Sequence, residues 1–224
     1  MLQRCLLALL LTLPTAALAA PAQYALDPVH TRVLFAIEHA GFSKALGTVS
    51  GSSGSLLFDP DDWRSARLDA RVPLQRLDLG DAKWNRAALA RNLVDGERYP
   101  EAHFVSTRIE PIDATHAKVF GTLTLHGVSR EIALEVTLNA LKRHPLPPFR
   151  RTVGFSATAT LQRADFGIAA WPSVIGAAVE LRIEAEATRE GRADADQAQP
   201  ATPAPDADPD APTTSPSRSQ ESTP

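Results

Sequence analysis

The six histidines and two Ser/Gly segments are the residues of this chain whose types suit catalysis or metal binding. No histidine pair has the H-x-H or H-E-x-x-H spacing of a metal site. His30 and His39 are nine residues apart, about 30 Å along an extended chain. GFSAT, at 154–158, lacks the final glycine of a Gly-x-Ser-x-Gly nucleophile turn. GTVSGSSGS, at 47–55, lacks the lysine and helix of a phosphate loop. The sequence therefore predicts no catalytic residue and no metal site.

The N-terminal segment predicts export. Arg4 precedes an apolar run over 6–13 and an Ala-Leu-Ala cleavage site at 17–19, the pattern of a secretory signal peptide over residues 1–19. The apolar run is too short to span a bilayer, so we expect no transmembrane span in the mature protein. Export by the signal peptide leads us to expect a periplasmic location. Cys5, the one cysteine, is removed with this segment, which excludes disulfides, thiolate catalysis and Cys–zinc sites.

The C-terminal segment, residues 191–224, predicts disorder. It is rich in Pro, Asp, Ala, Ser and Thr and contains no large apolar residue, so it cannot bury enough surface to fold. Six acidic and two basic residues give it a charge of −4, which leaves the rest of the chain close to neutral. An acidic tail on a neutral body argues against nucleic-acid binding. Residues 20–190 remain as one domain.

Alternation of apolar and polar residues recurs through that domain and predicts strands with one apolar face. In GTLTLHGVSREIALEV, at 121–136, two alternating runs flank a compact turn at 126–129, which predicts an antiparallel hairpin. The segment 46–58 reads as a strand broken by Gly51 and Gly54. Other alternating segments lie at 33–37, 66–72, 153–161 and 179–185, and less regular ones at 102–109 and 117–125.

One helix is predicted over 81–93, with Asp81 as its N-cap and Asp95–Gly96 as its stop. One helix cannot cover the apolar faces of about eight strands, so the strands must cover one another. Short connections favour an all-β, eight-stranded antiparallel up-and-down barrel. An outer-membrane barrel is rejected because the polar faces carry too many Arg, Asp and Glu side chains to meet lipid.

A barrel of eight strands is either filled by its own side chains or holds one small ligand. The small residues on the apolar faces favour a hollow interior, whereas the general abundance of alanine leaves a filled barrel as the alternative. These residues are Ala66, Ala70, Ala157, Ala159 and Ala185.

Several segments, in order, resemble the YceI-like family of periplasmic polyisoprenoid-binding proteins with lipocalin-like barrels. The resemblance covers nearly all of 24–187, through YALDPVHTRVLFAIEHAGFSKALG at 24–47, GSLLFDPDDW at 54–63, LARNLVDGERYPEAHFVST at 89–107, GTLTLHGVSREIAL at 121–134 and GFSATATLQRADFGI at 154–168. It departs at Thr122, where an acidic residue is usual, and at the loop AAWPSVIG, at 169–176. Departures of this kind, mostly at loops or near the barrel mouth, bear on the identity of the ligand more than on the fold.

The resemblance implies a lipocalin-like barrel with the helix at or near its mouth. It also implies a non-enzymatic binding protein that holds a lipophilic polyisoprenoid, a quinone or a polyprenyl phosphate, for transport, storage or stress protection. No further cofactor is implied. The side chains expected to line the cavity are Phe35, Ile37, Trp84, Leu89, Leu93, Phe104, Leu123, Leu125, Leu134, Phe155 and Phe166.

Arg163 and His39 are the candidates for contact with a headgroup at the mouth. The alternatives are that Arg163 pairs with Asp165 or another carboxylate and that His39 satisfies backbone groups at a strand end. Two other functions stay open. An enzyme acting on a lipophilic substrate would need two titratable groups facing one another inside the barrel. A filled barrel would act as an interaction module through its tail. The oligomeric state, monomer or dimer, is also open.

Overall fold

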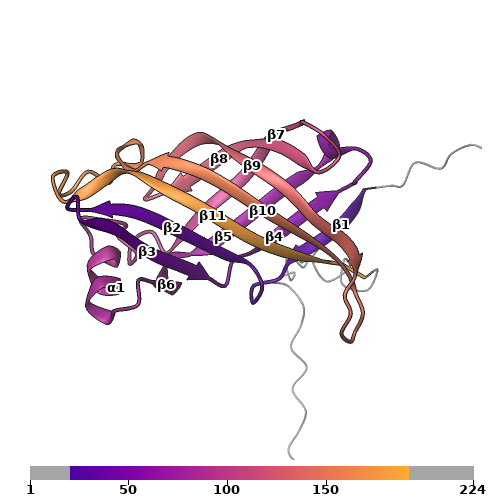
Figure 1. Ribbon diagram of the computed structural model, residues 1–224, viewed down its shortest axis with the longest axis horizontal. Coiled ribbons are helices and arrows are strands. Elements are labelled where there is room, and N and C mark those ends of the chain that lie inside the picture. Colours follow the sequence, from indigo (N-terminus) through magenta and orange to yellow (C-terminus); the bar gives the residue numbers. More distant parts are fainter. Residues whose placement is uncertain (1–20, 192–224) are drawn as a thin grey trace, which may run out of the picture. The chain divides into compact units, whose positions relative to one another are not determined.

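The computed structural model describes residues 21–191. The expected signal peptide and the expected disordered tail after Gly191 lie outside the described residues. Figure 1 shows a barrel of strands with one α-helix, α1 (Ala82–Leu89), at one end. The strands are β1 (Ala22–Leu26), β2 (Arg32–His39), β3 (Ser43–Ser50), β4 (Ser53–Phe58), β5 (Arg67–Pro73), β6 (Leu77–Asp78), β7 (Glu101–Pro111), β8 (His116–Leu125), β9 (Val128–Arg143), β10 (Arg151–Gln162) and β11 (Ile175–Arg189).

These strands close into an eight-stranded antiparallel barrel, as the sequence predicted. The order β1-β4-β5-β7-β8-β9-β10-β11 returns to β1 through the pairs Tyr24↔Arg189 and Leu26↔Ala187. Beyond β1, the long β11 pairs with β2, which pairs with β3, which pairs with β6. Three of the eight strand positions are therefore each filled by two consecutive strands, β1 with β2, β3 with β4, and β5 with β6. The connectivity is up-and-down throughout.

The three breaks in these positions lie beside one another. They fall at 27–31, at 51–52 and at 74–76. The Gly51 amide donates to the Pro28 carbonyl at 3.2 Å, and a Cβ on Gly51 would lie 2.9 Å from the Arg76 side chain. Gly51 has φ +80°, a conformation that glycine adopts without strain. The break predicted at Gly51 is confirmed, and it belongs to a bend shared by three neighbouring strand positions. The break predicted at Gly54 is wrong, because Gly54 lies within β4 and pairs with Ala70.

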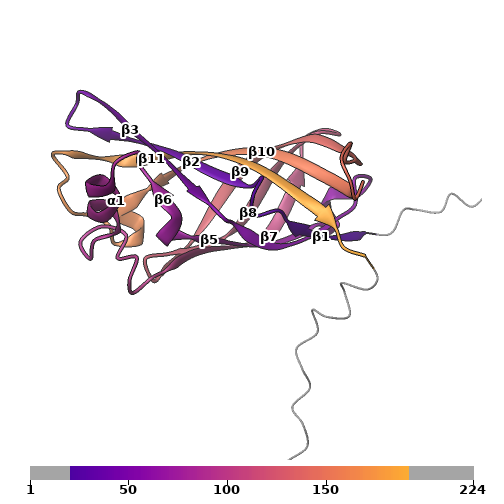
Figure 2. The same cartoon turned by 90° about the horizontal axis from the view of Figure 1, so that it is seen from below.

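The two ends of the barrel differ. In Figures 1 and 2, α1 lies at the same end as the β2–β3 turn and the β10–β11 loop, and β1 lies toward the opposite end. We call the first end the mouth and the opposite end the floor. The mouth also carries the β8–β9 turn, and the floor carries the connections 59–66, 112–115 and 144–150.

The β8–β9 hairpin has a tighter turn than predicted. Its connection is His126–Gly127 alone, with φ +52° and +73°, in place of the four residues 126–129. Two consecutive positive φ values give a turn whose twist matches that of the flanking strands. A Cβ on Gly127 would lie 2.6 Å from the Tyr99 ring, so glycine is also required by packing. His126 Nδ1 lies 3.0 Å from the Phe166 carbonyl, which ties the turn to the segment after β10.

The helix is shorter than predicted. Asp81 caps α1 as expected, its carboxylate accepting from the amides of Lys83 at 2.8 Å and Trp84 at 3.1 Å. The predicted end at residue 93 is wrong, because Ala90 is extended (φ −66°, ψ 158°) and ends the helix after Leu89. The chain then folds back on the helix, and the Gly96 amide donates to the Leu89 carbonyl at 3.0 Å. The apolar pattern of the sequence continues to Leu93, beyond the end of the helix, so the pattern alone overestimated the length of the helix.

Gly54→Ala should destabilise the barrel. Gly54 has φ +151°, and a Cβ there would lie 2.0 Å from the Asp69 carbonyl oxygen of the paired strand. We expect a loss of about 2 kcal/mol or more, or about 4–8 °C in Tm. Gly80→Ala is the control, because Gly80 has φ +82° with open space around it. An equal loss in thermal melts of the two variants would contradict the role of the Asp69 contact.

Candidate functional site

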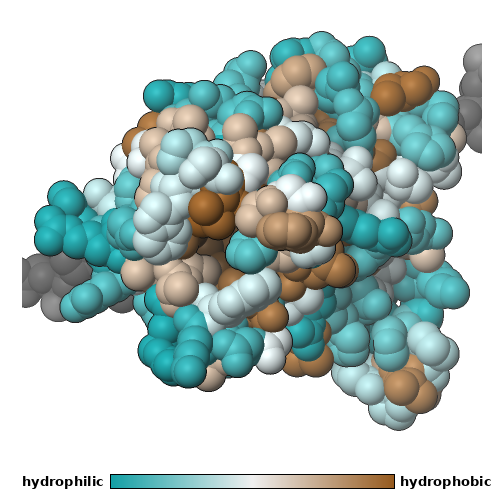
Figure 3. Space-filling view, turned by 60° about the vertical axis from the view of Figure 1, so that its left-hand side comes forward, coloured by the Kyte–Doolittle hydropathy of each residue, from teal (hydrophilic) through white to brown (hydrophobic). Residues whose placement is uncertain are grey.

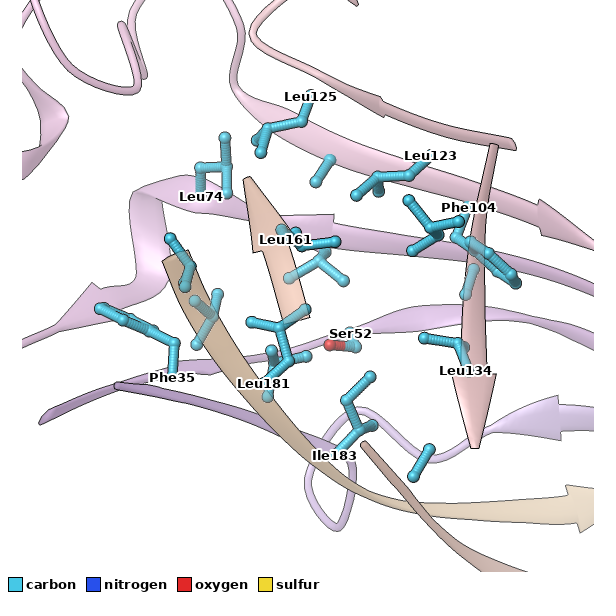
Figure 4. Close-up of a pocket in the computed structure, with 18 of the residues that line it drawn as sticks. Phe35, Ser52, Leu74, Phe104, Leu123, Leu125, Leu134, Leu161, Leu181 and Ile183 are labelled. Carbon is cyan, nitrogen blue, oxygen red and sulfur yellow. The ribbon is translucent and has the colours of Figure 1, made fainter. Parts of the chain in front are cut away.

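The barrel is hollow. A cavity of about 580 Å³ runs between the strands, and its lining is almost wholly apolar (Figure 4). Pockets of a few hundred to a thousand Å³ hold one small organic ligand. The filled-barrel alternative is therefore wrong for this structure, and the apolar faces predicted by the alternation do surround empty space.

Ten of the eleven residues expected to line the cavity do so. Leu89 does not: it packs against the core from the last turn of α1, close to Gly96. The helix ends there, and the following turn presents Leu93 and Val94 to the cavity instead. The ten are Phe35, Ile37, Trp84, Leu93, Phe104, Leu123, Leu125, Leu134, Phe155 and Phe166.

Two glycines on the inner face make room for aromatic rings. Gly47 is the register partner of Phe35, and a Cβ on Gly47 would lie 2.2 Å from the Phe35 ring. Gly121 on β8 pairs with Ser106 on β7, and a Cβ on Gly121 would lie 2.3 Å from the ring of the nearby Phe104. Each ring therefore lies against the wall over a glycine rather than extending across the lumen. The sequence analysis missed these glycines, although an inward glycine on an alternating strand is itself a signal.

Three aromatic rings close the floor. Phe58 packs edge-on against Trp63 at 5.2 Å and against Phe155 at 5.4 Å between ring centroids. Phe58 and Trp63 are buried and line the cavity, and the sequence analysis had not named either of them. Trp63 belongs to a short 3-10 turn after β4, outside any alternating segment, so periodicity gave no signal for it.

Aromatic side chains also surround the mouth. Trp84 on α1 and Trp171 in the β10–β11 loop both line the cavity, yet they are 44% and 52% exposed. His39 packs against Trp84 with ring centroids 5.4 Å apart. Phe42, at the tip of the β2–β3 turn, is 91% exposed. Figure 3, turned toward this end, shows hydrophobic residues around a recess in the surface.

Within residues 21–191, the titratable side chains that line the cavity are Glu38 and His39, at the end of β2, and Arg163, which directly follows β10; all three lie at the mouth. Arg163 is buried, and its three guanidinium nitrogens donate to the carbonyls of Gly176 (2.8 Å), Ile168 (2.8 Å) and Ile175 (2.9 Å). Burial lowers the pKa of this guanidinium. Arg163 thus holds the mouth loop to β11 instead of pairing with Asp165. Its contact with a headgroup, like that of His39, stays a prediction.

Among residues 21–191, no group of three or more His, Cys, Asp or Glu side chains is placed to hold a metal ion. No helix in the same range is long and apolar enough to cross a membrane. The site is therefore described by its shape, its apolar walls and the few polar groups that face it.

The fold is shared with solved structures. BcnA of Burkholderia cenocepacia superposes with a TM-score of 0.64 at 21% identity, over 72% of this chain and 98% of that protein. A YceI protein of Campylobacter jejuni gives 0.61 at 23% identity, over 67% and 88%. A polyisoprenoid binding domain from Saccharophagus degradans, implicated in plant cell wall breakdown, gives 0.54 at 16% identity, over 75% and 98%. At these identities the likeness shows the fold.

Sequence relatives are closer. A UPF0312 protein of Pseudomonas syringae pv. syringae is 34% identical over 172 residues, which span 75% of this chain and 88% of the relative. A UPF0312 protein of Vibrio parahaemolyticus is 31% identical over 182 residues, or 80% and 93%. The family model of the YceI-like domain matches residues 24–187, which is the whole barrel apart from the strand ends at β1 and β11. The chain therefore belongs to the YceI-like domain family.

Proposed function

We propose that this protein is a non-enzymatic carrier that holds one lipophilic polyisoprenoid-type molecule, a quinone or a polyprenyl phosphate, inside the barrel. The cavity of about 580 Å³ with apolar walls is the observation that carries the proposal. Family membership and the likeness to the polyisoprenoid binding domain of Saccharophagus degradans support it. Transport, storage and stress protection all require the same reversible binding.

The walls suit a hydrocarbon tail energetically. Each buried methylene contributes about 0.8 kcal/mol, so one isoprene unit contributes roughly 3–4 kcal/mol before the entropy of association is deducted. A few units therefore reach micromolar affinity without a polar contact. Because aromatic rings close the floor, a ligand would enter through the mouth.

The distribution of polar groups favours a carrier over an enzyme. An enzyme in this cavity would need titratable groups facing one another at depth. Glu38, His39 and Arg163 lie at the mouth, and Arg163 already donates to three carbonyls. The described lining thus has its titratable side chains at the mouth and not in facing pairs at depth, which supports binding more than proton transfer inside.

We also propose that the chain is exported to the periplasm and cleaved after Ala19, on the basis of the segment 1–19. Expression in a Gram-negative host and cell fractionation should place the mature protein in the periplasm, with Ala20 as its first residue by N-terminal sequencing. Recovery from the cytoplasm with Met1 intact would contradict this.

Gently purified protein should carry its ligand. Native mass spectrometry should show a mass above that of the chain, and organic extraction should release an apolar compound. After delipidation, titration with a short-tailed ubiquinone should quench tryptophan fluorescence with a micromolar or lower Kd, because all three tryptophans of the chain line the cavity. A clean apo mass together with no binding of quinones or polyprenyl phosphates would overturn the carrier proposal.

Gly47→Ala should narrow the cavity. The new methyl group displaces the Phe35 ring from the wall, and the direction left open is the lumen. We expect at least about tenfold weaker binding of a long-tailed ligand, equivalent to about 1.4 kcal/mol. The double variant Gly47→Ala with Phe35→Leu should recover most of the affinity by removing the ring. Unchanged affinity in the single variant would show that the ligand does not reach this part of the wall.

A further inference from the structure

One polar side chain faces the cavity without a hydrogen-bond partner at mid-barrel. The Ser52 residue is 2% exposed, lines the cavity, and its hydroxyl has no partner within the described residues. Figure 4, which draws part of the lining, shows the Ser52 oxygen among carbon atoms of neighbouring apolar side chains. Thr31, the other hydroxyl residue on the lining, differs, because its Oγ1 donates to the Glu186 carbonyl at 3.2 Å.

The position of Ser52 follows from the bend in the barrel. It follows Gly51 in the gap between β3 and β4, at the level where three neighbouring strand positions break. The strand residues on either side of it that face inward, Val49 and Leu56, are apolar. A buried hydroxyl without a partner is destabilising, and alanine in its place would avoid that cost. An unpaired serine at this depth therefore indicates a partner that comes with the ligand.

A second unpaired group lies at the floor. The Trp63 indole Nε1, in a residue 6% exposed, is also buried without a partner in the described part of the chain. Indole N–H can only donate, and a serine hydroxyl can donate as well as accept. Both unpaired groups on the lining can therefore bind an acceptor oxygen below the mouth.

That oxygen must be neutral. The arginine on the described lining, Arg163, directly follows β10 at the mouth, while Ser52 lies at the bend. A phosphate placed beside Ser52 would lose its hydration without a compensating cation, which costs far more than one hydrogen bond returns. A ketone, ether, ester or hydroxyl oxygen loses little hydration by comparison and gains the bond.

We propose that Ser52 is a ligand-recognition residue that donates a hydrogen bond to a neutral oxygen of a molecule inserted with this oxygen inside the barrel. The inference rests on the proposed carrier function and narrows its ligand class. It favours oxygen-bearing lipophiles such as quinones over polyprenyl phosphates, whose tails carry no neutral oxygen to reach this depth. Specificity then comes from the Ser52 hydroxyl on a wall that is mostly apolar.

The test compares Ser52→Ala with the wild-type chain, using two probes: a short-tailed ubiquinone, which carries carbonyl and ether oxygens, and squalene, which carries none. Binding is measured on delipidated protein by tryptophan fluorescence and native mass spectrometry. We expect Ser52→Ala to weaken ubiquinone binding about tenfold and to leave squalene binding unchanged. Ser53→Ala, at the exposed neighbouring serine, is the matched control and should alter neither. The thermal stability of ligand-free Ser52→Ala should equal or exceed that of the wild type.

The outcomes separate this inference from the carrier proposal. Equal ubiquinone affinity in Ser52→Ala and wild type overturns the role of Ser52 while leaving the carrier function standing. Parallel weakening of ubiquinone and squalene shows that Ser52 acts through packing and also overturns it, as does a clear loss of stability in the ligand-free variant. If the wild-type chain binds neither these probes nor a polyprenyl phosphate, the carrier function itself fails.

Discussion

Closure of the sheet between β1 and β11 is the constraint on which the rest of the structure depends. An open sheet of this length would leave two unpaired edges and one bare apolar face. The β11 strand is long enough to pair with β2 along one part and with β1 along another, so a single strand completes the ring. Three neighbouring strand positions bend at 27–31, 51–52 and 74–76, and this bend allows them to curve around the closed barrel. Once closed, every inward side chain faces the same enclosed volume.

Whether such a ring is full or empty is then decided by side-chain size and direction. Alanines on several strands and the glycines at 47 and 121 reduce the volume that the walls occupy. The rings of Phe35 and Phe104 lie over those glycines, while Phe58, Trp63 and Phe155 gather at the floor. The large side chains are thus used at the walls and the base, and the middle of the barrel stays open.

The polar groups are arranged along the axis of the cavity. The titratable side chains on the described lining lie at the mouth, and below them the unpaired hydroxyl of Ser52 and the indole N–H of Trp63 interrupt the apolar wall. Because the desolvation cost of a charge far exceeds that of a neutral oxygen, depth itself selects between ligand classes. The proposed preference for a neutral oxygen-bearing lipophile follows from this gradient.

Much of this architecture could be predicted from local patterns. Alternation over 121–136, 153–161 and 179–185 determined which residues face inward, since side chains on a strand point alternately to the two faces. About eight strands with one apolar face each, and a single helix, then determined an all-β fold in which the strands cover one another. Asp81 determined where the helix begins, because a cap is a local interaction.

Only the tertiary structure decided the rest. Leu89 does not line the cavity, because the helix ends early and the chain then folds back on it. Arg163 donates to three carbonyls of segments that only the folded chain brings next to it. Trp63 and Ser52 reach the cavity from a 3-10 turn and a strand break, where no periodicity applies. Local sequence patterns record which face of a strand a residue occupies, whereas closure brings distant segments together and determines what remains unpaired.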